Sequence, residues 1–274
     1  MIRRFNRFEL KYLLPLETAE ALKADLAGQV EADSFSGHTG YHVWSLYYDS
    51  PAYEFFWDKI EGLKFRRKLR IRAYPDSENP ALETVMVEIK QRINKTVQKR
   101  RLRLPIEKAY ELCTGQFSGM DLDPLDAAVV AEVKALVVSK NLRPSCLISY
   151  HRTAYHGNRY NPGLRITFDT ELKARCTQLV LDPSPAVAAE NRYFIPPDWC
   201  ILEIKLNDKV PDWLVSLLNA HNCELRRVSK YCSGLAHNKA FQVNHTSLSP
   251  LILPEQPSLQ PANPFIHPER IVAP

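Results

Sequence analysis

Hydrophobic and polar positions along much of the chain alternate with a period of two, which is the spacing of a strand whose faces meet different environments. Because several such segments follow one another without a helical segment between them, the sheet is predicted to be largely antiparallel. The predicted strands cover residues 5–13, 41–49, 64–74, 84–92, 97–104, 146–155, 163–171, 177–181 and 200–206.

Apolar residues three or four positions apart predict helices in other segments. This spacing is clear over residues 124–140, where one stripe is predicted to contain Leu125, Val129, Val133, Leu136 and Val137. It is also found over residues 15–27, a segment that ends at Gly28. Shorter helices are predicted over residues 105–114, 211–220 and 229–240. The strands and helices together predict an α+β fold.

The polar faces of the predicted strands carry mainly charged residues. Residues two apart on a strand lie on the same face. The same-face sets are Glu9/Lys11, Arg70/Arg72, Glu88/Lys90/Arg92, Lys99/Arg101/Arg103 and Glu203/Lys205. For any single strand, a solvated outer face explains the pattern. Its repetition favours a closed sheet with the charged face inward, because neighbouring like charges repel unless an anion lies between them.

The composition allows a folded core and excludes several protein classes. The chain has 274 residues, of which 45% are hydrophobic, and a net charge of +5, which permits a polyanionic partner. No apolar run approaches the roughly 18–20 residues of a membrane helix, and Glu9 and Lys11 interrupt any signal-peptide core after the basic start. The six cysteines are isolated, as is typical of reduced thiols. We therefore expect a cytoplasmic protein.

Proline is concentrated at the end of the chain. Residues 243–274 contain seven prolines and no lysine, so this segment is predicted to be an extended tail. Residues 1–242 are predicted to form the folded domain.

Several short motifs resemble one protein family. Phe8-Glu9-Leu10-Lys11-Tyr12 is similar to the Glu-x-Lys signature that opens the triphosphate tunnel metalloenzymes, also called the CYTH superfamily. The remaining motifs resemble one branch, the polyphosphate polymerase domain of the vacuolar transporter chaperone (VTC) complex. In family order, they are Leu46-Tyr47-Tyr48-Asp49, Lys68-Leu69-Arg70-Ile71-Arg72, Val87-Glu88-Ile89-Lys90, Lys99-Arg100-Arg101, Tyr150-His151-Arg152-Thr153-Ala154-Tyr155, Leu164-Arg165-Ile166-Thr167-Phe168-Asp169, Ile201-Leu202-Glu203-Ile204-Lys205 and Ser229-Lys230-Tyr231.

The resemblance implies an eight-stranded antiparallel β-barrel, with helices packed outside and phosphates bound in its tunnel. The residues implied to face phosphates are Lys11, Arg70, Arg72, Lys90, Lys99, Arg152, Arg165 and Lys230. Glu203 is implied to hold Mn²⁺ or Mg²⁺. Strand parity alone adds Arg101 and Lys205, and Tyr150 and Ser229 are further candidates for ligand binding. For Tyr150, packing is the alternative, and Ser229 is also a candidate N-cap of the last helix.

The implied activity is transfer of the γ-phosphoryl group of ATP to a growing inorganic polyphosphate chain. The residue types suit this reaction, because phosphoryl transfer depends on positioning and on neutralising oxygen charge. A phosphate nucleophile is already ionised and needs no general base. The alternatives are a tunnel triphosphatase, which has water as the acceptor, and a non-catalytic polyphosphate-binding module.

The implied partners are ATP and inorganic polyphosphate or triphosphate. RNA binding is disfavoured because few aromatic residues accompany the charged strand positions, so no nucleic-acid partner is expected. The sequence contains no SPX-type regulatory domain, and we expect a stand-alone core. Chain export would then need a membrane-protein partner, which would place the protein at the inner face of a membrane.

Overall fold

The computed structural model describes residues 8–37, 39–75, 82–94, 96–182, 184–207, 209–238 and 241–242. One antiparallel sheet has eight main strands, in the order β1-β10-β8-β7-β3-β4-β5-β6. These are β1 (Phe8–Pro15), β10 (Trp199–Leu206), β8 (Arg165–Arg175), β7 (Arg143–Gly157), β3 (Tyr41–Asp49), β4 (Phe65–Ala73), β5 (Thr84–Ile93) and β6 (Thr96–Pro105). Two short strands extend it: β2 (Val30–Ala32) pairs with β7, and β9 (Arg192–Tyr193) pairs with β8. The predicted α+β class and antiparallel sheet are confirmed.

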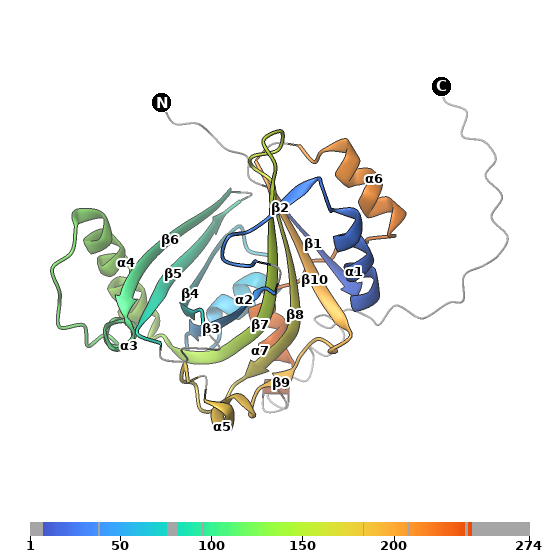
Figure 1. Ribbon diagram of the computed structural model, residues 1–274. Coiled ribbons are helices and arrows are strands. Elements are labelled where there is room, and N and C mark those ends of the chain that lie inside the picture. Colours follow the sequence, from blue (N-terminus) through green and yellow to red (C-terminus); the bar gives the residue numbers. More distant parts are fainter. Residues whose placement is uncertain are drawn as a thin grey trace.

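The helices lie in three groups around the curved sheet (Figure 1). In the view of Figure 1, α3 (Ile106–Thr114) and α4 (Pro124–Lys140) lie at the left, beyond β5 and β6. On the right, α1 (Leu16–Asp25) and α6 (Asp212–Ala220) flank β1 and β10. Between these arms lie α2 (Glu54–Ile60) and α7 (Lys230–Ala236), and α5 (Pro185–Ala188) lies at the lower end.

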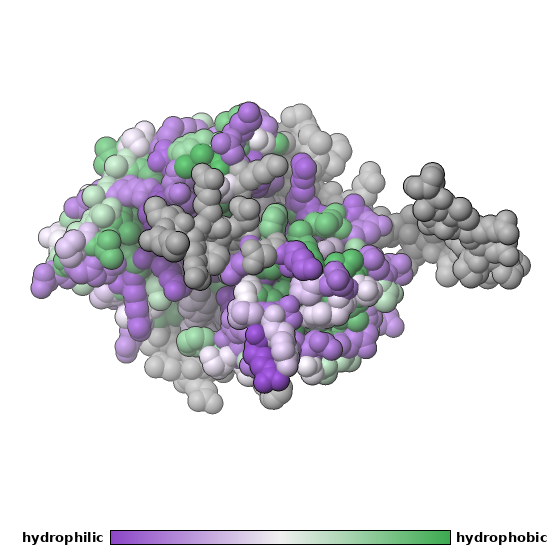
Figure 2. All heavy atoms as spheres, turned by 90° about the horizontal axis from the view of Figure 1, so that it is seen from above, coloured by the Kyte–Doolittle hydropathy of each residue, from purple (hydrophilic) through white to green (hydrophobic). Residues whose placement is uncertain are grey.

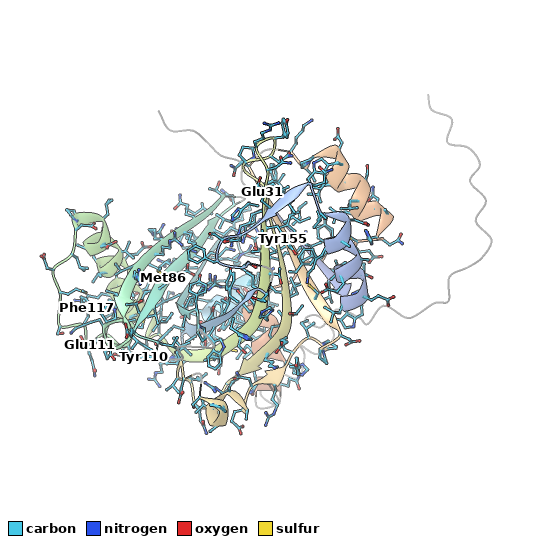
Figure 3. All side chains as sticks on the ribbon, viewed as in Figure 1. Glu31, Met86, Tyr110, Glu111, Phe117 and Tyr155 are labelled. Carbon is cyan, nitrogen blue, oxygen red and sulfur yellow. The ribbon has the colours of Figure 1, made fainter. Side chains whose placement is uncertain are left out.

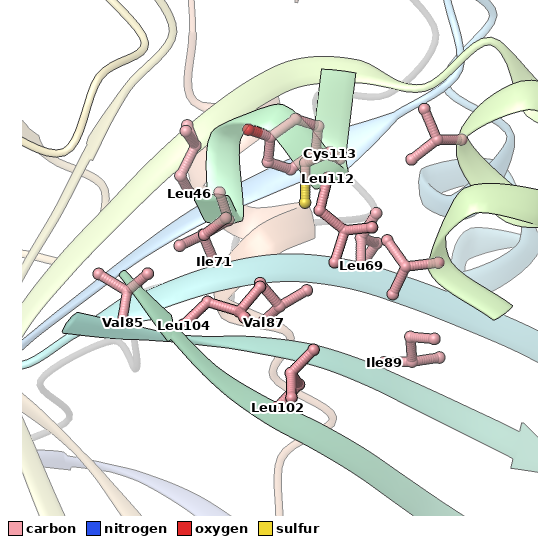
Figure 4. Packing of buried hydrophobic residues seen from close by; sticks show 14 of the residues in the cluster. Leu46, Leu69, Ile71, Val85, Val87, Ile89, Leu102, Leu104, Leu112 and Cys113 are labelled. Atoms are coloured by element: carbon pink, nitrogen blue, oxygen red, sulfur yellow. The ribbon is translucent and has the colours of Figure 1, made fainter. Parts of the chain in front are cut away.

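Two apolar clusters cover the convex face of the sheet. Beneath α3 and α4, Leu69, Val87 and Leu102 point toward Leu112 and Cys113 (Figure 4). A separate cluster joins α1 and α6 to the outer faces of β1, β8 and β10. Burial of each large side chain stabilises the fold by about 1.5–3 kcal/mol. On the face seen in Figure 2, hydrophilic residues are widespread and hydrophobic residues form smaller patches.

Helix α7 packs against the concave face of the sheet. Its Tyr231 and Leu235 form a buried cluster with Tyr47 of β3 and Ile148 of β7. Gly234 allows this close approach, because a Cβ atom there would lie 2.3 Å from Cδ1 of Ile148. The expectation that the helices all pack outside the barrel is therefore wrong for α7, which fills one end of the enclosed space.

The sheet curls but does not close through its backbone. Within the described residues, the end strands β1 and β6 are not paired with each other. The free edge of β1 instead meets the chain before α7, where the Arg226 amide donates to the Lys11 carbonyl at 2.8 Å. Side chains span the gap between the arms, because Lys90 Nζ of β5 lies 3.2 Å from Glu9 Oε2 of β1. The predicted closed barrel is thus corrected to an open, curled sheet.

One predicted strand is wrong. Residues 177–181 form a loop, in which Gln178 has a left-handed backbone (φ 44°). The apolar alternation arises because Leu179 and Leu181 pack against the cluster beneath α3, and the Leu181 amide donates to Tyr110 Oη at 2.8 Å. The short elements α2, α5, β2 and β9 have no counterpart among the predicted elements.

Three further predictions concern the cysteines, membrane-spanning helices and the C-terminal tail. All six cysteines are free thiols, as predicted. In the part of the chain that the structure describes, no helix has the length and apolarity needed to cross a membrane. The predicted proline-rich tail, residues 243–274, lies outside the described residues.

Candidate functional site

The strand register places the predicted basic residues on the concave face of the sheet. Lys11 lies opposite Glu203, and Lys205 lies opposite Arg165. Their neighbours of opposite parity belong to the apolar clusters of the convex face, and Figure 3 shows side chains extending from both faces. The concave set comprises Lys11, Arg70, Arg72, Lys90, Lys99, Arg101, Arg152, Arg165 and Lys205. Lys230 joins it from the first turn of α7.

Glu88 organises the cations of β4 and β6. Its buried carboxylate accepts from Arg70 Nε at 2.8 Å and also contacts Lys99, and Arg72 Nε lies 3.9 Å away. Burial would raise the pKa of Glu88, but Arg70, Arg72 and Lys99 lower it to about 2. Glu88 is therefore a permanent anion that aligns three cations.

Asp169 of β8 holds a second group. Its fully buried carboxylate accepts from Arg152 Nε at 2.6 Å and from Arg152 Nη2 at 2.8 Å, and Lys230 Nζ lies 2.6 Å away. Burial opposes ionisation, but the two cations lower the pKa of Asp169 to about 2. The bidentate pair fixes the guanidinium plane. Asp169 was not among the predicted site residues.

Glu203 and Glu9 form a third group between the arms. Lys205 Nζ lies 2.5 Å from Glu203 Oε1, and the ammonium groups of Lys11 and Lys230 each lie 4.0 Å from Glu203 Oε2. Despite burial, Lys11, Lys205 and Lys230 hold the pKa of Glu203 well below its usual range. Glu9 pairs with Lys11 at 2.8 Å. Lys230 thus connects the second group to the third.

Two predicted residues lie at the margin of these groups. Arg165 Nη2 donates to Asp33 Oδ2 at 2.8 Å, and His156 Nε2 lies 3.1 Å from the same oxygen. Asp33 lies in the loop after β2, outside the segments of alternating charge, so no local sequence signal identified it. Arg101 is exposed on the end strand β6, and it forms no ion pair with another residue of the described ranges.

Tyr150 and Ser229 have clear structural roles. The buried Tyr150 hydroxyl accepts from Arg72 Nη2 at 3.3 Å, while Arg152 and Lys230 lie over its ring at 5.1 and 4.9 Å. Ser229 is the N-cap of α7, and its hydroxyl also accepts from Lys68 Nζ at 2.8 Å.

Lys68 and Tyr47 are concave-face residues that were not predicted. Lys68 lies two positions before Arg70, so the parity argument that found Arg72 could also have found it. Tyr47 lies opposite Arg70 in the register and accepts from Arg70 Nη1 at 2.8 Å. Its ring stacks on Tyr231, with centroids 4.9 Å apart, and the Tyr231 hydroxyl donates to Asp49 at 2.5 Å. This chain of contacts connects α7 to Arg70 of β4.

We expect the pKa of Tyr47 to lie below the usual range of a tyrosine. Burial would raise its pKa, but Arg70, Arg72 and Lys68 lower it to about 8. A bound triphosphate would disfavour the phenolate and move this midpoint upward, so affinity for triphosphate should fall as pH rises past the midpoint. Ultraviolet absorbance should show one tyrosinate forming near pH 8 in the wild type but not in Tyr47→Phe. The control variant Tyr160→Phe, which changes an exposed tyrosine, should keep the absorbance change near pH 8. Loss of this change in Tyr160→Phe, or its persistence in Tyr47→Phe, would contradict its assignment to Tyr47.

The residues around Glu203 fit a divalent cation that takes its other ligands from phosphate and water. Among the described residues, no three carboxylate, imidazole or thiol groups gather into a metal-binding cluster. However, Thr167 lies opposite Glu203, and its buried hydroxyl has no hydrogen-bond partner within the described residues. Mg²⁺ is commonly bound through one or two carboxylates and substrate phosphates. The donor set therefore suits a cation carried in with a phosphate chain.

Together, the ten predicted cations and Lys68 make eleven basic side chains. Five carboxylates pair with cations of this set, namely Glu9, Asp33, Glu88, Asp169 and Glu203, which leaves a formal excess of six positive charges. The carboxylates orient the cations without neutralising them all. Such a face can bind a flexible polyanion at many points, because guanidinium groups supply paired donors and ammonium groups supply point charges.

Comparisons with known proteins give one family match and several distant similarities. The family described as "VTC domain" matches residues 6–239. Subunit 4 of the vacuolar transporter chaperone complex of Schizosaccharomyces pombe is 25% identical over 238 residues, covering 71% of this chain but 31% of that protein.

Two solved structures are similar at low identity. A putative adenylate cyclase from Bacillus halodurans is 13% identical, with a TM-score of 0.44, over 81% of this chain and 92% of its own. Another from Vibrio parahaemolyticus is 11% identical, with a TM-score of 0.42, over 81% of this chain and 94% of its own.

Proposed function

Because the chain belongs to the VTC domain family, we propose that its concave face binds inorganic polyphosphate and extends it with the γ-phosphoryl group of ATP. The observation that carries this proposal is the convergence of three groups of cations, each oriented by a buried carboxylate, on one face. The cations that we assign to phosphate contacts are Lys11, Arg70, Arg72, Lys90, Lys99, Arg101, Arg152, Arg165, Lys205 and Lys230.

The geometry suits phosphoryl transfer. The transition state carries charge on its non-bridging oxygens, and catalysis depends on fixed positive groups around them. Arg70 and Arg152 are fixed by Glu88 and Asp169, so their guanidinium groups need little reordering when substrate enters. Glu203, with Thr167 beside it, would hold a divalent cation, Mn²⁺ or Mg²⁺, against the phosphate chain. The cation would supply further charge neutralisation.

The lowered carboxylate pKa values favour phosphate over water as the acceptor. Activation of water needs a base whose pKa is near the working pH. Against burial, neighbouring cations lower the pKa values of Glu9, Glu88 and Asp169 to about 2, so these groups are weak bases. The pKa values of Lys205 and Tyr47 are both lowered to about 8, the first mainly by burial and the second, against burial, by Arg70, Arg72 and Lys68, but a bound polyanion would raise both again. A terminal phosphate is already ionised and needs no base, which supports polymerisation over triphosphate hydrolysis.

Incubation of the purified protein with ATP and Mn²⁺ tests the proposal. We expect long polyphosphate on a gel, together with ADP. If free phosphate is the main product, the protein is a triphosphatase and not a polymerase. If the protein binds triphosphate tightly but forms no product, it is a non-catalytic binding module. Parallel reactions with Mg²⁺ measure the metal preference.

The cellular setting belongs to the same proposal. The chain spans less than a third of the length of its curated relative. We propose that residues 1–242 form the catalytic unit in the cytoplasm, where ATP is available, and that a membrane-protein partner exports the product.

Arg72 should be essential because it combines charge with a fixed planar fork. It donates to Ser45 Oγ at 3.1 Å and to Tyr150, which leaves part of its guanidinium group for substrate. A lost charge-assisted hydrogen bond costs about 1.5–3 kcal/mol, roughly ten- to a hundred-and-fifty-fold in binding. Arg72→Ala should therefore lower turnover by at least this factor, while Arg72→Lys, which keeps the charge, should lose less triphosphate binding and turnover.

Thermal melts with and without tripolyphosphate check this result. The ligand-induced rise in Tm should be largest in the wild type, smaller in Arg72→Lys and smallest in Arg72→Ala. Equal shifts in the three proteins would place Arg72 outside the phosphate site.

A further inference from the structure

One end of the β4–β5–β6 arm forms a surface, which we call the basic tip, comprising residues 63–67, 91–94 and 96–97. Phe65 lies directly opposite Ile93 in the register. The Asn94 amide donates to the Lys64 carbonyl at 2.7 Å, which holds the segment before β4 against the β5–β6 turn. The two segments are therefore one structural unit.

The basic tip exposes large apolar side chains. Leu63, Phe65, Ile93 and Val97 are 45%, 47%, 40% and 43% exposed. Phe65 and Ile93 share the convex face, while Val97, opposite Arg92, lies on the concave face. Single exposed apolar residues are ordinary, but four around one projection mark an interaction surface.

The charge of the basic tip is entirely positive. Its described residues include Lys64, Arg66, Arg67 and Arg92 and no acidic residue, so their formal charge is +4. The Arg67 guanidinium lies over the Phe65 ring, 5.1 Å from its centroid. Basic and apolar groups are thus interleaved rather than separated.

We propose that the basic tip docks on an anionic phospholipid bilayer. Basic residues near a membrane are attracted to anionic headgroups, while exposed apolar side chains enter the boundary between headgroups and acyl chains. A fully hydrated polyanion would use the basic residues but would leave the four apolar side chains in water. The combination therefore favours a bilayer over nucleic acid or free polyphosphate.

Docking would also orient the concave face. Lys68, Lys90 and Lys99 lie on the same three strands, within three residues of the basic tip. A bilayer bound at the tip would consequently lie beside this end of the polyphosphate site. The docking itself does not depend on turnover, so it can be tested whatever reaction the site performs.

Co-sedimentation of the full chain with vesicles tests the proposal. We expect binding to phosphatidylcholine vesicles that contain roughly 30% phosphatidylserine, weakened by salt, and much weaker binding to pure phosphatidylcholine. The double variant Phe65→Ser with Ile93→Ser should bind the anionic vesicles about tenfold or more weakly, because the apolar contribution is lost. Lys64→Gln with Arg67→Gln should weaken binding similarly.

A matched control removes two apolar side chains elsewhere. Leu125→Ser with Val138→Ser changes residues of α4 that are 81% and 76% exposed, and it should bind as the wild type does. Saturating tripolyphosphate should leave vesicle binding intact, because it occupies the concave site and not the basic tip. If the vesicles were instead bound through lipid headgroups in the concave site, tripolyphosphate would displace them.

Three results would overturn the proposal: no binding to the anionic vesicles, unchanged binding by the Phe65 and Ile93 variant, or full competition by tripolyphosphate. Thermal melts of each variant show whether the protein remains folded. ATP turnover in the absence of vesicles should match the wild type, since none of these residues belongs to the phosphate site.

Discussion

Asp169→Asn is expected to lower the free energy of unfolding by about 3–5 kcal/mol, because it leaves the buried Arg152 and the largely buried Lys230 without their anion. In the wild type, this carboxylate pairs with both Arg152 and Lys230 in a fully buried position. Asparagine keeps the shape and removes the charge. Turnover should also fall steeply, since both cations lose the group that positions them.

Denaturant unfolding measures the loss of stability, and its pH dependence checks the cause. Cations lower the pKa of Asp169 from 3.8 to about 2 in the folded protein, against the effect of burial. Its stabilising contribution is therefore complete above the unfolded value and disappears as pH falls through this interval. The slope of stability against pH between these two values should be smaller in Asp169→Asn than in the wild type.

A second measurement connects Asp169 to the polyanion. Tripolyphosphate should raise the Tm of Asp169→Asn by more than it raises that of the wild type, because phosphate oxygens can replace the missing carboxylate. Glu190→Gln, which removes an exposed partner of Arg192 at 3.6 Å, serves as the control and should change stability little. A wild-type unfolding free energy in Asp169→Asn would contradict the role assigned to this carboxylate.

Glu203→Gln is expected to reduce turnover by on the order of a hundredfold or more, the scale typical of losing one fixed electrostatic group in an active site. The substitution removes the carboxylate assigned to the divalent cation. Triphosphate binding should persist, because Lys11, Lys205 and Lys230 remain and lose an anion that competes for them.

Turnover measured over a series of Mn²⁺ concentrations, with triphosphate binding measured by calorimetry, separates the two effects. Glu171→Gln, which alters an exposed pair with Lys173, is the matched control and should behave as the wild type does. Wild-type turnover of Glu203→Gln at limiting Mn²⁺ would refute the metal role. If the variant loses triphosphate binding together with turnover, Glu203 instead maintains the structure of the site.

The positions of the basic residues could be predicted from the sequence because strand parity is a local property. Arg70 and Arg72 share a face in any strand, whatever the strand pairs with. The same argument applies to Lys68, which parity would have placed beside them. The stripe over residues 124–140 likewise predicted α4 with its observed bounds, since helical spacing is set by the backbone itself.

The partners of those cations could not be predicted in this way. Arg165 pairs with Asp33, which is 132 positions away, and Lys68 contacts Ser229, which is 161 positions away. Such pairs depend on how far the sheet curls and on which loops return to it. The strand expected at residues 177–181 failed for a related reason, because distant packing and Tyr110 hold its apolar residues in a loop.

The sequence by itself determined that one face of an antiparallel sheet would be cationic and the other apolar, because alternation needs only the two-residue repeat of a strand. The tertiary structure alone decided that the sheet stays open, that α7 fills one end, and that Glu88, Asp169 and Glu203 divide the cations into groups. These features arise from contacts between strands and helices far apart in the chain. Their geometry depends on the summed twist and packing of the whole fold, which no local pattern encodes.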